Sequence, residues 1–256
     1  MKLFAKTYGS GNTDLIIIHG LFGMSDNWST IAKRLAANFK VHLLDLRNHG
    51  RSPHSDVFNY DVLSDDVVEY IYDHNIKKPI LLGHSLGGKV TMKLAFSYPE
   101  ILLKQVIVDI SPREYSIDFH KDLLSKIIKV NLDDYDKRSD VEEALSADIP
   151  DFRIRSFVLK NLYRDINKTF AWRFNVEILI QQISNIKEAS FLNGQCDIET
   201  LFIRGENSNY INKEDEFLIQ KHFSNLRIET INGAGHWVHA ENPDDFYSQV
   251  LKFCSN

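Results

Sequence analysis

The segment "GHSLG" (83–87) places a serine between two glycines in the spacing G-x-S-x-G. The apolar run "PILLGHS" (79–85) predicts a buried strand, and "LGGKVTMKLAFSYP" (86–99) predicts a helix that Pro99 ends. A serine at a sharp strand-to-helix turn projects its hydroxyl above the sheet, and flanking glycines let the backbone pack closely around it. This context favours Ser85 as a nucleophile over the alternative of an ordinary glycine-rich turn.

A serine hydroxyl is a weak nucleophile until a base accepts its proton. The best candidate for this base is His236 in "INGAGHWVHAENP" (231–243), because it directly follows a predicted strand and a Gly-x-Gly turn. It also lies after the serine, near the C-terminal end, as the chain order serine, acid, histidine requires. His239 is the rival, but it comes after the turn and we expect it to be structural. The alternative for His236 is a loop histidine that caps the last helix.

Attack on a carbonyl also needs two N–H donors for the oxyanion. Leu86 provides one at a helix N-terminus, where negative charge is favoured. The second donor should come from "HGLFGMSDNW" (19–28), with Leu21 as first choice and Phe22 as second. A plain strand-to-helix turn is the alternative for this loop. The next loop, "DLRNHGRS" (45–52), is expected to fix loop geometry without a catalytic role.

The acid that should orient the histidine is less obvious. In one large class of enzymes it lies three residues after the glycine that ends a strand such as "LFIRG" (201–205), but here that position is Ser208. Glu206 follows the glycine by one residue, which is too early in the loop. Asp215 is expected to belong to the next helix as an N-terminal charge.

The better candidate for the acid is Asp109, which ends "KQVIVDIS" (104–111), the strand after that of the nucleophile. A carboxylate that follows four apolar residues is costly to bury unless something pairs with it, and an imidazole N–H is a suitable partner. Ser208 would then be an auxiliary member that hydrogen-bonds near His236. The alternative for Asp109 is an ordinary aspartate at a strand end.

Strands that alternate with helices must bring these distant residues together. We predict strands from short apolar runs at 15–20, 41–46, 79–85, 104–111, 200–205 and 226–232. We predict helices at about 27–38, 60–75, 86–99, 213–223 and 243–254. Such alternation indicates βαβ units and a mostly parallel central sheet flanked by helices, which is the α/β class.

This alternation is interrupted in residues 112–190, which contain no clear strand. Helical stretches are predicted there at 118–130, 140–146, 153–163 and 170–183. The economical interpretation is a core domain of 1–111 and 191–256 with a helical cap, 112–190, inserted over one end of the sheet. The alternative is a second helical domain that is unrelated to any site.

Composition is that of an ordinary globular protein, with 256 residues, 43% hydrophobic and 25% charged. The net charge of −5 argues against nucleic acid or an anionic membrane as partner. Two cysteines, Cys196 and Cys254, provide no disulfide framework, and no signal peptide or membrane span is visible. We therefore expect a cytoplasmic protein whose partner is a small molecule. The composition does not indicate an oligomeric state.

Four motifs, in order and spacing, resemble the α/β-hydrolase superfamily: "HGLFG", "DLRNHGRS", "GHSLGGKV" and "GAGHWVHAENP". Within it, "DLRNHGRSPHS" and "VIVDISP" look most like the bacterial YbfF-type esterases. This resemblance implies the α/β-hydrolase fold, with a cap inserted after the strand that ends near Asp109. It also implies hydrolysis of short acyl esters or thioesters without metal or cofactor. The family's acid lies on the strand of Asp109, which supports that choice.

The leading hypothesis is therefore a carboxylesterase or thioesterase of the serine type. The same scaffold could instead perform carbon–carbon bond hydrolysis, lyase chemistry or perhydrolysis, and a non-catalytic binding protein is a third reading. A carboxylate nucleophile, as in haloalkane dehalogenases and epoxide hydrolases, is disfavoured by Ser85.

The cap should supply part of an apolar acyl pocket. Its aromatic residues are candidates for that lining: Tyr115, Phe119, Phe152, Phe157, Tyr163, Phe170, Trp172 and Phe174. Its basic residues could meet an anionic or coenzyme A-like substrate, although a solvated helix face is the commoner explanation: Arg113, Lys121, Arg153 and Arg155.

Overall fold

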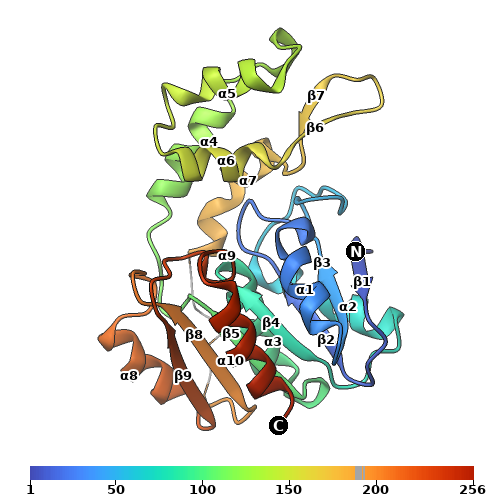
Figure 1. The fold of residues 1–256 in the computed structure, drawn as a ribbon, viewed down its shortest axis with the longest axis vertical. Helices are drawn as coiled ribbons and strands as arrows, with labels where there is room; N and C mark the ends of the chain where they lie inside the picture. The colour runs from blue at the N-terminus through green and yellow to red at the C-terminus, as the bar shows by residue number, and fades with distance from the viewer. Residues whose placement is uncertain (188–191, 193) are drawn as a thin grey trace.

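A seven-stranded sheet forms the centre of the computed structural model, which describes residues 1–187, 192 and 194–256 (Figure 1). The strand order is β1-β3-β2-β4-β5-β8-β9, and every neighbouring pair is parallel except β1 with β3. The strands are β1 (Ala5–Tyr8), β2 (Asp14–Ile18), β3 (Lys40–Leu44), β4 (Ile80–His84), β5 (Lys104–Val108), β8 (Thr200–Gly205) and β9 (Leu226–Ile231). The predicted α/β class and mostly parallel sheet are confirmed. The antiparallel edge strand β1 was not predicted.

Helices cover both faces of the sheet. They are α1 (Ser29–Leu35), α2 (Tyr60–Asp73), α3 (Leu86–Ser97), α8 (Lys213–His222), α9 (Val238–Glu241) and α10 (Pro243–Cys254). Alternate strand residues face opposite sides. Leu15 and Ile17 pack with α1 and α10, whereas Ile16 and Ile18 pack with α2, α3 and α8. Burial on both faces explains why these strands are continuous apolar runs.

The segment between β5 and β8 lies over one end of the sheet (Figure 1, green to orange). Its elements are α4 (Asp118–Ile127), α5 (Arg138–Ser146), α6 (Phe152–Leu159), β6 (Leu162–Arg164), β7 (Phe170–Trp172) and α7 (Val176–Gln182). We call this segment the cap. It follows β5 directly, so it lies at the carboxyl ends of the parallel strands.

One prediction for the cap is wrong. The segment contains the antiparallel pair β6 and β7, although the sequence suggested no strand there. The helix predicted at 153–163 ends at Leu159, and the one predicted at 170–183 begins only at Val176. The turn of this hairpin is built by Asp165, whose side chain accepts the N–H groups of Asn167 and Thr169 at 2.9 and 3.0 Å. A side chain that satisfies the backbone in this way favours a turn over a helix.

The predicted division of the chain into a core of 1–111 and 191–256 and a cap of 112–190 stays a prediction. Its second boundary, between 190 and 191, lies outside the described residues. Within the described ranges, every helix is too short or too polar to cross a membrane.

Candidate active site

Ser85 occupies the junction where β4 ends and α3 begins, with φ 51° and ψ −113°. Residues other than glycine rarely adopt such a conformation, and it is found mainly at functional sites. The two flanking glycines are required. A Cβ on Gly83 would lie 2.2 Å from the Gly87 carbonyl oxygen, and a Cβ on Gly87 would lie 2.3 Å from that of Ile18. The "GHSLG" spacing therefore allows β4, α3 and β2 to meet around a strained serine.

Asp109 follows β5 and is fully buried, with 0% exposure. Its Oδ2 lies 2.7 Å from His236 Nδ1 and accepts the Ser208 hydroxyl at 2.5 Å. Its Oδ1 accepts the Gly205 N–H at 3.1 Å. These three donors offset the cost of burying a carboxylate. The structure thus brings together Asp109, His236 and Ser208, as the sequence suggested, and their catalytic roles are proposals made below.

The His236 ring is held on two further sides. Tyr210 stacks on it with centroids 3.9 Å apart and planes 18° apart. The His236 carbonyl oxygen accepts a hydrogen bond from His84 Nε2 at 2.9 Å. Burial lowers the pKa of His84 well below its ordinary value, so this ring is neutral. Since Asp109 binds Nδ1 of His236, Nε2 is the ring nitrogen that Asp109 does not occupy.

The turn "GLFG" (20–23) lies directly against the serine. A Cβ on Gly20 would lie 3.3 Å from Ser85 Cβ. The Gly23 N–H donates to the Gly20 carbonyl at 2.9 Å, which closes the turn with Leu21 and Phe22 at its centre. We call residues 20–23 the oxyanion turn, after the role that we propose for it below.

Of the two N–H groups considered in this turn, only one is available. The Phe22 N–H donates to His49 Nε2 at 3.1 Å. In the part of the chain that the structure describes, no acceptor binds the N–H of Leu21, nor that of Leu86 at the start of α3. Leu21 and Leu86 are therefore the donors that remain for an oxyanion.

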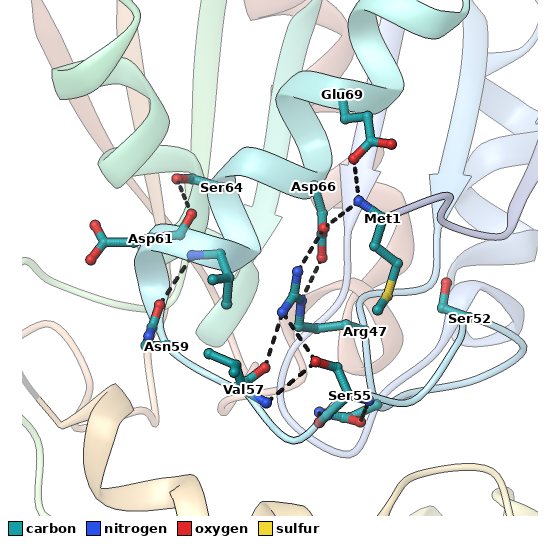
Figure 2. Close-up of polar contacts among 12 residues, drawn as sticks. Met1, Arg47, Ser52, Ser55, Val57, Asn59, Asp61, Ser64, Asp66 and Glu69 are labelled. Atoms are coloured by element: carbon teal, nitrogen blue, oxygen red, sulfur yellow. Dashed lines mark hydrogen bonds and ion pairs between the residues drawn. The ribbon is translucent and has the colours of Figure 1, made fainter.

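The loop of residues 45–52 contacts this turn through His49. Figure 2 shows the polar contacts that hold the loop at Arg47. Arg47 forms a two-bond ion pair with buried Asp66, at 2.6 and 2.8 Å, and Asp66 also binds the amino group of Met1. Asp45 Oδ1 accepts the Ser25 N–H at 2.6 Å. The charges of this loop thus fix its geometry.

The alternative acids lie elsewhere. Glu206 is exposed and accepts the Gly233 N–H at 2.8 Å. Asp215 is buried in the capping box of α8 with Asn212, and it accepts the Ser111 hydroxyl at 2.7 Å. In the described structure neither carboxylate is hydrogen-bonded to His236.

The other histidines have structural positions. His239 stacks on Trp28 with centroids 3.8 Å apart, and burial lowers its pKa to about 3. His19 Nε2 accepts the Leu46 N–H at 3.0 Å, and burial lowers the pKa of this ring to about 4. Both rings are therefore neutral packing groups, and for His239 the sequence suggested a structural role.

A cavity of ≈ 220 Å³ opens at Ser85 and His236, between the sheet and the cap. Its lining is mainly apolar and aromatic. The cap contributes Phe119, His120, Leu123, Ile154 and Phe157 to this lining. Of the eight aromatic candidates in the cap, only Phe119 and Phe157 line it, and none of the four basic candidates does.

Sequence reasoning missed several lining residues, above all Trp28, His120, Tyr210 and Trp237. Two of them had a usable signal, because Trp237 is adjacent to His236 and Tyr210 lies two residues after Ser208. Among the described residues, no cluster of three or more His, Cys, Asp or Glu side chains is arranged to hold a metal ion.

Comparisons with known proteins agree with this geometry. Residues 14–243 match the family described as the alpha/beta hydrolase fold. The chain is 32% identical to Esterase YbfF of Escherichia coli, over 96% of this chain and 94% of that protein. It is 36% identical to the sn-1-specific diacylglycerol lipase ABHD11 of Xenopus tropicalis, over 93% of this chain and 77% of that one.

A solved structure described as a marine microorganism esterase superposes with a TM-score of 0.95 at 35% identity, covering 98% of this chain and 99% of that one. The resemblance to YbfF-type esterases is thus confirmed. The chain belongs to the α/β-hydrolase fold family and, like its esterase and lipase relatives, it is a carboxylesterase-type hydrolase.

Proposed function

We propose that the protein is a serine hydrolase that cleaves short-chain acyl esters or thioesters through an acyl-enzyme intermediate. The observation that carries this proposal is the 2.7 Å contact between Asp109 and His236 at the wall of the cavity that also contains Ser85. A buried carboxylate on one ring nitrogen leaves the other nitrogen to act as base toward the serine.

In the first half of the reaction, Ser85 Oγ attacks the acyl carbonyl carbon while His236 Nε2 takes its proton. The N–H groups of Leu21 and Leu86 bind the oxyanion of the tetrahedral intermediate. Asp109 fixes the histidine tautomer and stabilises the imidazolium, which then protonates the leaving alcohol or thiol. The acyl group stays on Ser85.

In the second half, water attacks the acyl-enzyme by the same steps. His236 takes a proton from the water, the oxyanion forms in the same hole, and Ser85 recovers its proton as the carboxylic acid leaves. Ser208 supports Asp109 through the hydroxyl hydrogen bond at 2.5 Å.

The cavity supports a small apolar acyl group. Its volume of ≈ 220 Å³ lies below the range of roughly 300–1,000 Å³ that is usual for drug-sized ligands. Its walls from the cap are phenylalanine, leucine and isoleucine apart from His120. Because one relative is named as a diacylglycerol lipase, a diacylglycerol is the first long-chain ester to compare with short ones.

The direct test is Ser85→Ala, with p-nitrophenyl acetate and butyrate as substrates. Loss of the nucleophile should lower kcat by about 10⁶-fold while the circular dichroism spectrum stays that of the wild type. A fluorophosphonate should label the wild type and not the variant. Labelling that persists at another serine would refute the assignment of Ser85.

The acyl and leaving groups are tested by a chain-length series, from acetyl to palmitoyl, offered as p-nitrophenyl esters, acyl-coenzyme A thioesters and diacylglycerols. We expect kcat/KM to be highest for the short acyl groups. A maximum at long chains would exclude the short-chain part of the proposal and keep the hydrolase part.

The compartment is a separate proposal. Cys196 and Cys254 are free and buried. Free thiols without a disulfide framework are usual in reducing compartments, and on this ground we propose the cytoplasm. Fractionation of cells that express the native protein would check it.

A further inference from the structure

The oxyanion turn holds a bulky residue in an unfavourable conformation. Phe22 has φ 60°, in the left-handed region, and it is buried at 2% exposure. A residue other than glycine pays roughly 1–2 kcal/mol for this conformation. Besides the packing of its ring on His120 and Phe174, neighbouring groups hold both of its peptide units in this conformation.

The first of these groups belongs to the core. His49 Nε2 accepts the Phe22 N–H at 3.1 Å, while His49 Nδ1 donates to the Arg47 carbonyl at 3.0 Å. This arrangement requires a neutral ring with its proton on Nδ1. Burial keeps it neutral, since the pKa of His49 is lowered to about 3.

The second group belongs to the cap. Asn161 lies between α6 and β6, and its Nδ2 donates to the Phe22 carbonyl oxygen at 2.9 Å. The contact joins residues 139 positions apart in the sequence and is buried. The side chain also meets the Phe157 and Val158 carbonyls at 3.5 and 3.4 Å, so one amide group joins the last turn of α6 to the oxyanion turn.

The orientation of this amide is fixed by its partner. A carbonyl oxygen can only accept, so Nδ2 and not Oδ1 must face Phe22. Asn161 is 1% exposed, and within the described part of the chain its Oδ1 has no hydrogen-bond partner. A buried amide that leaves one atom unsatisfied destabilises the fold, so packing alone does not explain asparagine at this position.

We propose that Asn161 is a positioning residue through which the cap holds the oxyanion turn in its catalytic geometry. The peptide unit that Asn161 holds includes the Gly23 N–H, which donates to the Gly20 carbonyl at 2.9 Å. That carbonyl shares its peptide unit with the Leu21 N–H, so the contact with Asn161 holds this N–H toward the carbonyl that Ser85 attacks. The inference rests on the proposed serine-hydrolase function. It adds that the cap contributes to stabilising the transition state and not only to the shape of the acyl pocket.

The consequence can be separated from substrate binding. An interaction that acts through the oxyanion hole is realised in the tetrahedral state and hardly at all in the bound ester. Loss of Asn161 should therefore lower kcat and leave KM nearly unchanged, whereas loss of a pocket wall should raise KM.

The experiment compares wild type with Asn161→Leu, which preserves the shape of the side chain, and Asn161→Ser, which is smaller and polar. The readouts are kcat and KM for p-nitrophenyl acetate and the inhibition constant of an alkyl trifluoromethyl ketone, which forms a tetrahedral adduct with the serine. Concentrations are normalised to the sites that a fluorophosphonate titrates. We expect kcat to fall by about 10- to 100-fold, KM to change by less than about threefold, and the inhibition constant to rise with the fall in kcat.

Two controls separate this effect from general loosening of the cap. Asn185→Ala removes another contact between the cap and the core, to the Phe58 carbonyl at 3.5 Å, in which no residue of the oxyanion turn takes part. Leu145→Ala removes fully buried apolar volume inside the cap. Both should retain the wild-type ratio of kcat to inhibition constant, even where the melting temperature of Leu145→Ala falls below that of the Asn161 variants.

The inference is overturned if Asn161→Leu and Asn161→Ser keep wild-type kcat, if they act only by raising KM, or if Leu145→Ala reproduces their effect on the ketone. These outcomes leave the proposed function standing, provided the wild type is labelled at Ser85. If the wild type is not labelled at all, the proposed function and this inference fail together.

Discussion

At the scale of single residues, the position of the acid that we propose distinguishes this site. The carboxylate comes from Asp109 after β5, and the loop after β8 contributes Ser208 to the same oxygen atom. The two strands are neighbours in the sheet, so either loop end can reach His236. A carboxylate after β5 and a hydroxyl after β8 thus lie where the large class of enzymes described above has one aspartate after β8.

Asp109→Asn should lower kcat by roughly 10³–10⁴-fold with the fold intact, because the amide favours the wrong histidine tautomer and cannot stabilise the imidazolium. Ser208→Ala should cost much less, about 10- to 100-fold, since it removes one hydrogen bond worth roughly 1–3 kcal/mol. Steady-state kinetics with p-nitrophenyl butyrate would measure both.

Glu206→Gln is the matched control for these two variants. Glu206 lies in the same loop as Ser208, but its carboxylate is exposed and binds the Gly233 N–H. We expect kcat within about twofold of the wild type, as is usual for a surface change of this kind. If Glu206→Gln is crippling and Asp109→Asn is mild, the acid has been assigned to the wrong strand.

At the scale of elements, the site depends on how closely α3 approaches the sheet. Gly87, in the first turn of α3, lies against the carbonyl groups of Ile18, which ends β2, and of His19. Its lack of a side chain lets the start of α3, which follows Ser85, lie against the end of β2. A fixed backbone on both sides makes this contact intolerant of added atoms.

Gly87→Ala should therefore move α3 away from β2 and lower both activity and stability, since its Cβ would lie 2.3 and 2.7 Å from two backbone oxygens. Gly88→Ala is the neighbouring comparison, because its Cβ would meet a side-chain methyl group of Ile110 at 2.5 Å and its nearest backbone atom, the Gly83 carbonyl oxygen, only at 3.1 Å. We expect kcat/KM to fall by more than about tenfold only for Gly87→Ala. Equal effects would show that the approach of α3 to β2 is not the critical contact.

At the scale of the whole molecule, several buried histidines are kept neutral by the fold. Burial lowers the pKa of His19 to about 4 and that of His49 to about 3, from an ordinary value of 6.5. Both accept a backbone N–H, from Leu46 and Phe22, through an unprotonated nitrogen. Protonation would therefore break contacts that support the oxyanion turn.

The native state should be acid-labile as a result. Between pH 6.5 and 4 the unfolded chain binds protons at these histidines and the folded chain does not, so the free energy of unfolding falls as pH falls. The stability that these neutral histidines contribute is fully present above pH 6.5. Between pH 6.5 and 4, each histidine can change the free energy of unfolding by up to about 1.4 kcal/mol per pH unit. Urea unfolding from pH 7.5 to 5 measures the slope, before most carboxylates titrate.

His49→Gln tests this account, because the glutamine oxygen can accept the Phe22 N–H and does not titrate. We expect a smaller slope of stability against pH than in the wild type. An unchanged slope would mean that His49 does not contribute to acid lability.

Much of this could be predicted from the sequence, since it depends on neighbours in the chain. The periodicity of apolar residues determined the alternating elements and the parallel sheet. The "GHSLG" segment identified the strained serine, because glycines at fixed spacing are a local requirement of the turn. The order of serine, acid and histidine placed Ser85, Asp109 and His236 at strand ends that a parallel sheet collects at one edge.

Only the tertiary structure decided what depends on contacts between distant segments. It put Phe119, His120 and Phe157 of the cap on the cavity wall, when nothing in their spacing distinguished them from the other cap aromatics. It also showed that residues 162–172 form a hairpin, in which the Asp165 side chain accepts the N–H of Thr169 in the turn. It also bound the N–H of Phe22 to a histidine 27 residues away, and for this reason we propose Leu21 as the donor. A backbone N–H is available to an oxyanion only if no other part of the fold accepts it, and the partners of a buried group are fixed by the packing of the whole chain.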